Sequence, residues 1–581
     1  MFAKPQSPAI STDKADTSDS LMTPPEKKLL FLILIAGSLL AALKTIFVSL
    51  HIDEEYQITM GYRLLRGEKL FADLWDPHQT SAFLTEFLMW IFEKIFSSLT
   101  GVVIWIRFCG TLIHLSVSYQ VYRVLTNYVS GEYSFYLCLL YFNLLPKNSV
   151  LPDYSLMFVW TLTLLLIHLF WLDQSKNLIH AVLCGFWMCV MVLSYPSSVL
   201  LFPMIFFLLL CGKEYGKKFC LIFSCVCLAG AFFYLLRLIT LTGSLSGLIG
   251  SLSDLLKGQS EYTQLSFMYK TMHYLREFLI GFLICGVYCL IAWLCLRLLS
   301  HFRKFTPTKA QFFYLSLAVG TIHHILHWIL MLRAFEQAYN YVIYFLVFAI
   351  LFFVRDKLAP TFKKTALIWA GASLAALLCV LILTDLTVYA SCKYMIPGYI
   401  MGICALMGYS AWEDPRTYQK HSRKLLLLLC FSAIFIKVWQ YPANAGVMFN
   451  ITSIRGIIKE GPAKGILTEY MTSYIAHSTY TEMEEYIPEG STLFILDGSS
   501  LGYLYRNAEV SSYTTISPPQ YNEILLHYWD DHPEKYPDVI AVTCWYGELH
   551  WDPESWIMQW IGNDYQASRI IDGKYYRYYF R

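Results

Sequence analysis

Charged side chains are scarce in this chain of 581 residues. Asp, Glu, Lys and Arg together make up 15% of it, whereas hydrophobic residues make up 56%. A water-soluble protein of this length carries more charge, so the composition predicts a polytopic α-helical membrane protein. The formal net charge of +2 shows no excess of either sign, and nothing in it suggests a nucleic-acid partner.

Several sequence patterns for nucleotides and metals are also missing. The chain has no P-loop, no Gly-x-Gly-x-x-Gly after a strand and no Asp-x-Asp motif of the kind found in nucleotide-sugar sites. Its 16 cysteines lie mostly inside apolar runs and form no Cys-x-x-Cys pairs. They are expected to pack as small hydrophobic residues, without a zinc site or a disulfide framework.

Long apolar segments are what the chain has in abundance. About thirteen of them are candidate membrane spans, at residues 29–50, 102–121, 133–145, 154–172, 178–193, 199–211, 219–239, 278–296, 312–332, 341–354, 366–384, 394–412 and 425–439. Basic residues gather in the loops that this count places on the N-terminal side, for example at 297–309, 355–364 and 416–424. The positive-inside rule therefore predicts a cytoplasmic N-terminus and an extracytoplasmic C-terminus.

The chain divides into three parts by composition. Residues 1–28 are polar and are expected to form a disordered cytoplasmic tail. Residues 29–442 form the transmembrane part, and residues 443–581 are polar enough for a small α/β domain on the outer side. Strands are expected at Thr492–Leu496 and 539–543, and a terminal hairpin turns at Asp572-Gly573.

The first outer loop, residues 51–101, is predicted to contain two helices. Tyr56 to Arg66 has Gly61 as its only weak position, and Gly67 suits the C-terminal cap. Residues 79–97 repeat apolar side chains at helical spacing but also contain Glu86, Glu93 and Lys94. That pattern indicates an amphipathic helix in the membrane interface, not a further span.

Acidic residues cluster at the mouth of the first span, in His51-Ile-Asp53-Glu54-Glu55. Carboxylates at a membrane boundary are costly unless they are solvated, paired or used in chemistry. They could cap a helix, or serve in catalysis or metal binding. Asp76 and His78 follow in the same loop. Each could either form a turn or have a functional role, and the sequence favours neither. Asp153 opens the fourth span on the same side, so it could cap that helix or share a cavity with Asp53.

Cations near the outer ends of spans are the other unusual group, because orientation rules disfavour them there. Each could be a snorkelling side chain. As a set they could hold an anionic lipid head group, since Arg in particular matches phosphate with two parallel hydrogen bonds. The set comprises Lys147, Arg237, Arg276, Arg333 and Lys393.

This arrangement resembles the GT-C superfamily of membrane glycosyltransferases, near the aminoarabinose transferases and protein O-mannosyltransferases. The resemblance lies in Asp53-Glu54 after the first span, in the two interfacial helices, and in the line from Tyr62 to Asp73 followed by Asp76-Pro-His-Gln-Thr80. The span number and the C-terminal domain extend it to the whole chain. Many relatives carry an acid and a lysine in a proline-rich turn, where this chain has Asp76-Pro77-His78.

The resemblance implies transfer of a hexose or pentose from a polyprenyl-phosphate carrier to a lipid, glycan or protein acceptor on the outer face, with inversion. In that reading Asp53 is the general base and Glu54 its partner. Asp76, His78, Asp153, Arg237, Arg333 and Lys393 contact the substrate, and Asp53 with Asp153 could hold a divalent metal ion. The implied location is a bacterial cytoplasmic membrane, in the cell envelope.

Two other functions fit an outer-face site. A lipid-linked oligosaccharide ligase or polymerase is expected to have larger outer loops and a site centred on Arg and His. A transporter or flippase is expected to show an inverted repeat and paired broken spans. The sequence shows neither an inverted repeat nor paired broken spans, and the ligase or polymerase stays open as an alternative.

Overall fold

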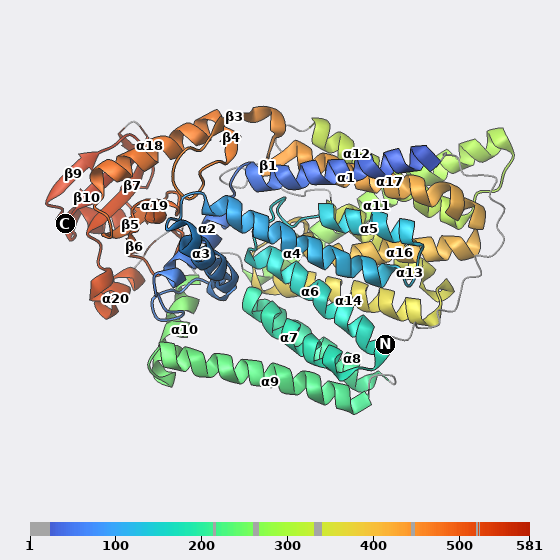
Figure 1. The fold of residues 1–581 in the computed structure, drawn as a ribbon, viewed down its shortest axis with the longest axis horizontal. Coiled ribbons are helices and arrows are strands. Elements are labelled where there is room, and N and C mark those ends of the chain that lie inside the picture. The colour runs from blue at the N-terminus through green and yellow to red at the C-terminus, as the bar shows by residue number, and fades with distance from the viewer. Residues whose placement is uncertain are drawn as a thin grey trace.

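The computed structural model describes residues 24–212, 216–259, 266–330, 340–442, 448–518, 521, 523–545 and 547–581. Most of the expected N-terminal tail lies outside the described residues. Residues 24–28, assigned to that tail from the sequence, instead form the start of helix α1 (Pro24–Phe47). Figure 1 shows a bundle of long helices with a strand-containing domain at one end.

Every one of the thirteen predicted apolar stretches contains a helix. Besides α1, these helices are α4 (Val102–Leu125), α5 (Gly131–Asn143), α6 (Tyr154–Ser175), α7 (Leu178–Ser194), α8 (Leu201–Cys211), α9 (Gly216–Leu241), α11 (Phe267–Arg303), α12 (Lys309–Leu330), α13 (Asn340–Val354), α14 (Pro360–Leu383), α16 (Ile396–Glu413) and α17 (Pro415–Trp439). In the described residues, seven helices are long and apolar enough to cross a membrane: α1, α4, α6, α9, α11, α14 and α16 with the short turns before it. By length and composition the chain is a multi-pass membrane protein.

The first loop forms two helices, as the sequence predicts. They are α2 (Ile52–Leu65) and α3 (Ala82–Phe96), with the short 3-10 helix η1 (Gln79–Ser81) before α3. Gly61 lets them approach closely, because a Cβ at this position would lie 2.9 Å from Thr85 and 3.2 Å from Met89. Figure 1 shows this pair between the helical bundle and the C-terminal strands.

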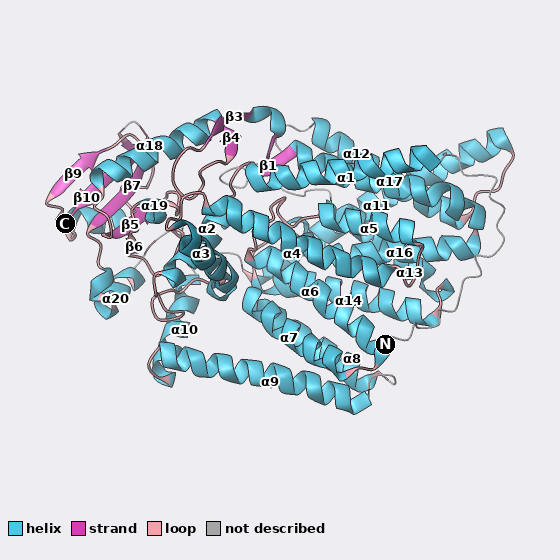
Figure 2. Cartoon of the chain, viewed as in Figure 1, coloured by secondary structure: helices cyan, strands magenta, loops and turns pink. Residues whose placement is uncertain are grey.

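The C-terminal domain is built on a mixed sheet, and Figure 2 shows the strands gathered in this part of the chain. The order β6-β5-β7-β10-β9 joins β6 (Glu509–Val510), β5 (Thr492–Leu496), β7 (Val539–Trp545), β10 (Tyr576–Phe580) and β9 (Arg569–Asp572), with β8 (Glu548–Leu549) beside β7. β5 runs parallel to β6 and β7, whereas β10 is antiparallel to β7 and β9. The predicted strands and the terminal hairpin are confirmed.

Helices cover both faces of this sheet, which explains why β5 is buried along its whole length. Leu493 and Ile495 pack with side chains of α2, α3 and α4, whereas Phe494 and Leu496 pack with the aromatic cluster around Trp529. The remaining elements of the chain are further helices and two ribbons. The helices are α10 (Leu245–Gln259), α15 (Val388–Ser391), α18 (Tyr470–Tyr486), α19 (Gly502–Tyr505), α20 (Ile524–Asp531) and α21 (Trp556–Asn563), and the 3-10 helices are η2 (Pro196–Leu200), η3 (Arg355–Lys357), η4 (Cys392–Met395), η6 (Ile451–Ser453) and η7 (Pro533–Lys535). Two ribbons pair β1 (Gln440–Pro442) with β2 (Met448–Asn450) and β3 (Ile454–Ile457) with β4 (Leu467–Glu469).

The loop between α5 and α6, residues 144–153, lies directly on α4. A Cβ at Gly110 of α4 would stand 1.9 Å from the carbonyl oxygen of Val150, so only glycine permits this approach. The loop thereby meets the start of α2 at the end of the bundle where α1 ends. We refer to this end as the Asp53 end.

Candidate functional site

The acidic cluster begins α2 with a capping box. His51 Nδ1 accepts a hydrogen bond from the Asp53 amide at 3.0 Å, and Glu54 Oε2 accepts one from the His51 amide at 2.9 Å. The helix dipole favours the three acids of this first turn. Because successive helical residues point about 100° apart, Asp53, Glu54 and Glu55 reach three different partners.

Asp53 faces a lysine from the loop between α5 and α6. Lys147 Nζ lies 2.6 Å from Asp53 Oδ2 and 2.7 Å from Asp153 Oδ2, and 4.0 Å above the centre of the Tyr154 ring. Asp153 also caps α6 by accepting a hydrogen bond from the Leu156 amide at 2.8 Å. The capping and the shared-cavity interpretations of Asp153 are therefore compatible.

Charge and burial set the protonation of this ion-paired group. Burial by itself would raise the pKa of Asp53, but the attraction of Lys147 outweighs it and holds the pKa well below the usual range. Burial would lower the pKa of Lys147, and the carboxylates of Asp153 and Asp53 instead raise it well above its usual value. The side chain of Asp53 is 26% exposed, against 5% for Lys147 and 6% for Asp153. Of the two carboxylates, Asp53 is thus the accessible one.

Glu54 is not paired with Asp53 as predicted, because its carboxylate faces Arg107. Arg107 of α4 donates to its two oxygens at 3.0 and 2.6 Å, and the Ser149 hydroxyl donates to one of them. Arg107 also donates to the carbonyl oxygens of Ile46, Val48 and Ser49, at the end of α1. Glu54 is fully engaged and its side chain is 2% exposed. It holds α1, α2, α4 and the loop together.

Glu55 points toward the C-terminal domain. Its Oε2 accepts a hydrogen bond from the Ser499 hydroxyl at 2.6 Å. Burial raises the pKa of Glu55 to about 7, against the lowering effect of this hydrogen bond, and the charge of Glu54 adds to the rise. The carboxyl is therefore protonated in the folded protein at pH values where an exposed glutamate is ionised.

This shift predicts a pH-dependent stability. The folded state binds the Glu55 proton more tightly than the unfolded state, so stability falls as the pH rises from about 4.5 to about 7 and the cost is complete above that range. Glu55→Gln should remove a cost of up to about 3 kcal/mol at pH 8 and change little at pH 4. Melting temperatures of the purified variant at both pH values test this, with Glu484→Gln, an exposed acid of α18, as the control. An equal gain at both pH values would contradict the titration of Glu55.

Aromatic rings enclose the other side of the Lys147 group. The His78 ring stacks on Tyr154 with centres 4.0 Å apart and lies 4.8 Å from Tyr195. Tyr195 lies 5.7 Å from Tyr394, whose hydroxyl is 3.1 Å from Ser155 Oγ. Burial lowers the pKa of His78 to about 3, and the Lys147 charge adds to this, so the imidazole is neutral.

Several buried polar atoms around these rings have no hydrogen-bond partner among the residues that the structure describes. They are His78 Nδ1 and the hydroxyl oxygens of Ser197, Ser198 and Ser391. Ser197 and Ser198 lie in η2, which begins directly after Tyr195, and Ser391 directly precedes η4 with Lys393 and Tyr394. Buried polar groups are nearly always paired in folded proteins. Open donors and acceptors beside aromatic rings are typical of a site that binds a polar ligand.

Not every residue expected at the site lies there. Asp76 accepts hydrogen bonds from the Thr515 amide at 3.0 Å and hydroxyl at 2.5 Å, so it links the loop to the C-terminal domain. Burial raises the pKa of Asp76 to about 6 although Arg63 lies nearby. Arg237 is exposed on α9, and Arg333 lies outside the described residues. Lys393 is buried in η4, close enough to Asp53 and His78 to shift both of their pKa values downward.

The expected metal site at Asp53 and Asp153 does not fit the side chains around it. The amine of Lys147 occupies the position between the two carboxylates that a cation would take. Nowhere in the described ranges do three or more His, Cys, Asp or Glu side chains form a group that could hold a metal ion. The two carboxylates form ion pairs with a lysine, and they do not provide the shell of oxygen ligands that a divalent cation needs.

Lys147 is predicted from the sequence only as one of the outer cations, and Arg107 and the tyrosines are not predicted at all. Lys147 does appear among the outer cations, and its neighbours Pro146, Pro152 and Asp153 mark a rigid loop before a span. That signal could have singled it out. Tyr154, Tyr195 and Tyr394 resemble any interfacial tyrosines in the sequence, so only the fold brings them together.

Comparisons with known proteins give structural likeness alone. No family model matches the chain, and no curated protein matches it in sequence. Among solved structures, ArnT from Cupriavidus metallidurans in the apo state aligns with a TM-score of 0.42 and 9% identity over 95% of this chain and 98% of that one. ArnT from the same organism bound to undecaprenyl phosphate aligns with a TM-score of 0.38 and 9% identity over 96% and 98%.

Proposed function

We propose that this chain is a membrane glycosyltransferase that moves a sugar from a polyprenyl-phosphate carrier to a hydroxyl group of an acceptor, with inversion at the anomeric carbon. The observation that carries the proposal is the Lys147 ion-paired group. It combines an accessible carboxylate, Asp53, with a buried cation beside open hydrogen-bonding groups. A base and an anion-binding cation side by side are what this transfer requires.

The carrier phosphate is the partner that fits Lys147. As the glycosidic bond breaks, the leaving polyprenyl phosphate gains charge, and a buried ammonium stabilises it strongly. In the structure Lys147 pairs with both Asp53 and Asp153 and offsets one of their two negative charges. When a phosphate also binds to Lys147, a further negative charge shares the ammonium and lies close to Asp53, so the pKa of Asp53 rises and the carboxylate becomes a better base. Donor binding thereby activates the base.

Asp53 then accepts the proton of the acceptor hydroxyl as that oxygen attacks the anomeric carbon. The bond from the anomeric carbon to the phosphate oxygen breaks in the same step, and the phosphate leaves with the electron pair. A double displacement would need a second free carboxylate as the nucleophile. Asp153 is engaged by Lys147 and the Leu156 amide, and Glu54 by Arg107. One accessible carboxylate favours a single displacement and hence inversion.

His78 and the tyrosines suit the sugar. The neutral imidazole and the hydroxyl groups of Ser197, Ser198 and Ser391 offer hydrogen bonds, while the rings of Tyr195 and Tyr394 offer flat apolar surfaces. We assign Lys393 to the phosphate end, because it lies near both Asp53 and His78. Glu54 is a positioning residue in this account, not a catalytic one.

The proposal places the reaction on the outer face of a bacterial cytoplasmic membrane, as the distribution of basic residues predicts. The acceptor is a lipid, glycan or protein, and the sugar a hexose or pentose. A ligase or polymerase is less well supported because the described site is centred on Asp and Lys. A transporter would have no need of a carboxylate held beside a lysine at an accessible position.

Turnover of a lipid-linked sugar by purified protein tests the function. The protein in proteoliposomes should release polyprenyl phosphate from a radiolabelled polyprenyl-phosphate pentose or hexose when membrane extract supplies acceptors. Mass spectrometry of the labelled product then identifies the acceptor. Movement of intact donor across the bilayer, without release of the carrier, would instead identify a transporter.

A further inference from the structure

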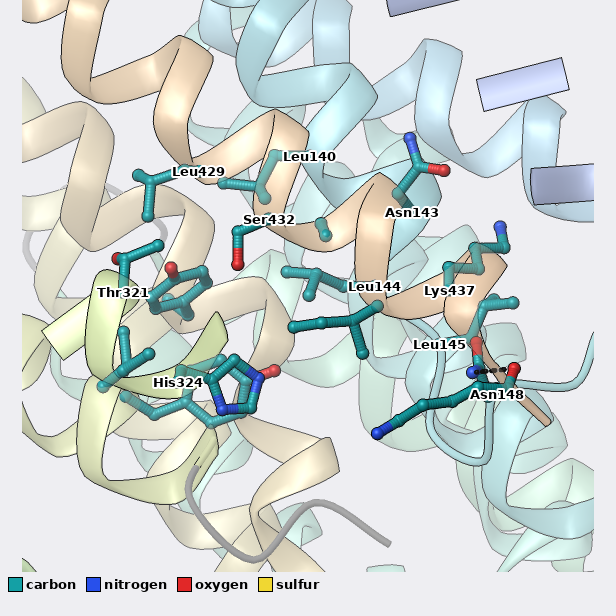
Figure 3. Close-up of a pocket in the computed structure, with 16 residues that line it drawn as sticks. Leu140, Asn143, Leu144, Leu145, Asn148, Thr321, His324, Leu429, Ser432 and Lys437 are labelled. Carbon is teal, nitrogen blue, oxygen red and sulfur yellow. Dashed lines mark hydrogen bonds between the residues drawn. The ribbon is translucent and has the colours of Figure 1, made fainter. Parts of the chain in front are cut away.

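A cavity lies at the Asp53 end of the bundle, on the other side of the loop 144–153 from Asp53. Its volume is about 80 Å³, and it is lined by α5, the loop, α12, α13, α16, α17 and β1. Figure 3 shows Thr321 and His324 on one side, Asn148 and Lys437 on the other, and Leu144 between them. A space of this size holds several water molecules or one small ligand.

Two amide side chains in the cavity wall leave hydrogen-bonding atoms open. Asn143 Nδ2 donates to Ser38 Oγ and to the Leu139 carbonyl, both at 2.8 Å, which fixes the orientation of its amide. Its Oδ1, an acceptor, then has no partner among the described residues, and neither does Gln440 Nε2, a donor. Asn143 and Gln440 are 3% and 4% exposed. Open atoms on side chains this deeply buried point to a ligand.

Two buried lysines border the cavity. Lys437 lines it, donates to the Phe142 carbonyl at 3.1 Å and lies over the Phe142 ring. Lys44 donates to the Gln440 carbonyl. Within the part of the chain that the structure describes, neither lysine is in an ion pair with a carboxylate. An anion that binds beside a buried lysine stabilises the charged form of its amine, so these two side chains favour an anion as the ligand.

The cavity shares its wall with the candidate active site. Asn148 Nδ2 donates to the Gln440 carbonyl at 3.2 Å on the cavity side, while the preceding residue, Lys147, reaches Asp53 on the other side. The backbone of Asn148 is left-handed, with φ of 54°, which turns the two neighbouring side chains in opposite directions.

We propose that this cavity is a second binding site, for a phosphate-type oxyanion that carries a hydroxyl group. Gln440 and Lys437 donate to its oxygens, and Asn143 accepts from its hydroxyl. A ligand held there also holds Asn148, and so steadies Lys147. The source of the oxyanion is either free phosphate or the head group of a phosphomonoester lipid. The binding itself does not depend on the proposed transfer reaction.

Calorimetry on protein in phosphatidylcholine nanodiscs tests the proposal, with inorganic phosphate in one arm and short-chain phosphatidic acid in the other. Saturable binding in either arm is expected. Gln440→Met keeps the backbone carbonyl that Lys44 and Asn148 use, and it should weaken the affinity by about tenfold or more, since a hydrogen bond to a charged group is lost. Gln174→Met, at an exposed position of α6, should bind as the wild type does.

Two further variants separate this cavity from the Lys147 site. Ser432→Leu adds an apolar side chain at the cavity wall, removes no charge and should abolish binding with the melting temperature retained, which keeps the test open if Gln440→Met does not fold. Binding that is lost in Lys147→Met but unchanged in both cavity variants would place the anion at the first site and overturn the proposal. Absence of saturable binding in both arms would overturn it as well.

Discussion

Asp53→Asn should reduce the rate of sugar transfer by about 10² to 10⁴-fold, the usual contribution of a general base. The amide keeps the size of the carboxylate but cannot accept the proton of the attacking hydroxyl. Single-turnover transfer with saturating donor measures the chemical step directly. Because the carrier phosphate binds to Lys147 and not to Asp53 in this account, donor affinity should change far less than the rate.

The fold should tolerate this substitution. Lys147 keeps its ion pair with Asp153 at 2.7 Å, and the capping box uses the Asp53 amide, not its side chain. Asp254→Asn is the matched control, since Asp254 of α10 pairs only with Lys257, at 3.1 Å, in the described contacts. Retained transfer in Asp53→Asn, with melting temperatures matching the control, would remove Asp53 from the role of base.

Lys147→Met should affect both stability and donor binding. Removing the lysine breaks the ion pairs of both Asp53 and Asp153 with it, and breaking a buried ion pair in this way typically costs about 3 to 5 kcal/mol. The carrier phosphate also loses its cation, so both the donor affinity and the transfer rate should fall. Thermal melts and equilibrium binding of polyprenyl phosphate measure the two effects separately.

A double variant separates the structural loss from the functional one. Lys147→Met with Asp153→Asn removes one charge of each sign, so most of the lost stability should return. Binding of polyprenyl phosphate should stay weak, because no cation has been restored. If the double variant instead binds the carrier as the wild type does, Lys147 has only a structural role.

The helices of this protein are predictable because hydropathy is a local property of the sequence. The helical form of the first-loop pair and the β9–β10 hairpin are also local patterns, and both are confirmed. That the pair lies in the membrane interface stays a prediction. Seven helices meet the length and apolarity that a span needs in the described residues, whereas the sequence gives about thirteen stretches. The helices α5, α8 and α13 have 13, 11 and 15 residues, which is shorter than the about 20 residues that span the hydrocarbon core of a bilayer.

The site is only partly predictable, because its partners are distant in the chain. The acidic turn marks the right place, but the ion pair of Asp53 with Lys147 and the pairing of Glu54 with Arg107 depend on how α1, α4 and the loop pack. Asp76 shows the same limit, since its partner Thr515 lies in the C-terminal domain. The divergence of the three acids does follow from helical geometry alone, and it explains why only one of them is accessible.

The most direct test of the account is an experimental structure with a non-hydrolysable polyprenyl-phosphonate sugar bound. The account predicts a phosphonate oxygen about 3 Å from Lys147 Nζ, within hydrogen-bond distance, with the sugar against His78 and Tyr195. The anomeric carbon should face Asp53, with room between them for an acceptor hydroxyl. A donor bound elsewhere, with Lys147 still paired to Asp53 and Asp153 alone, would contradict the account.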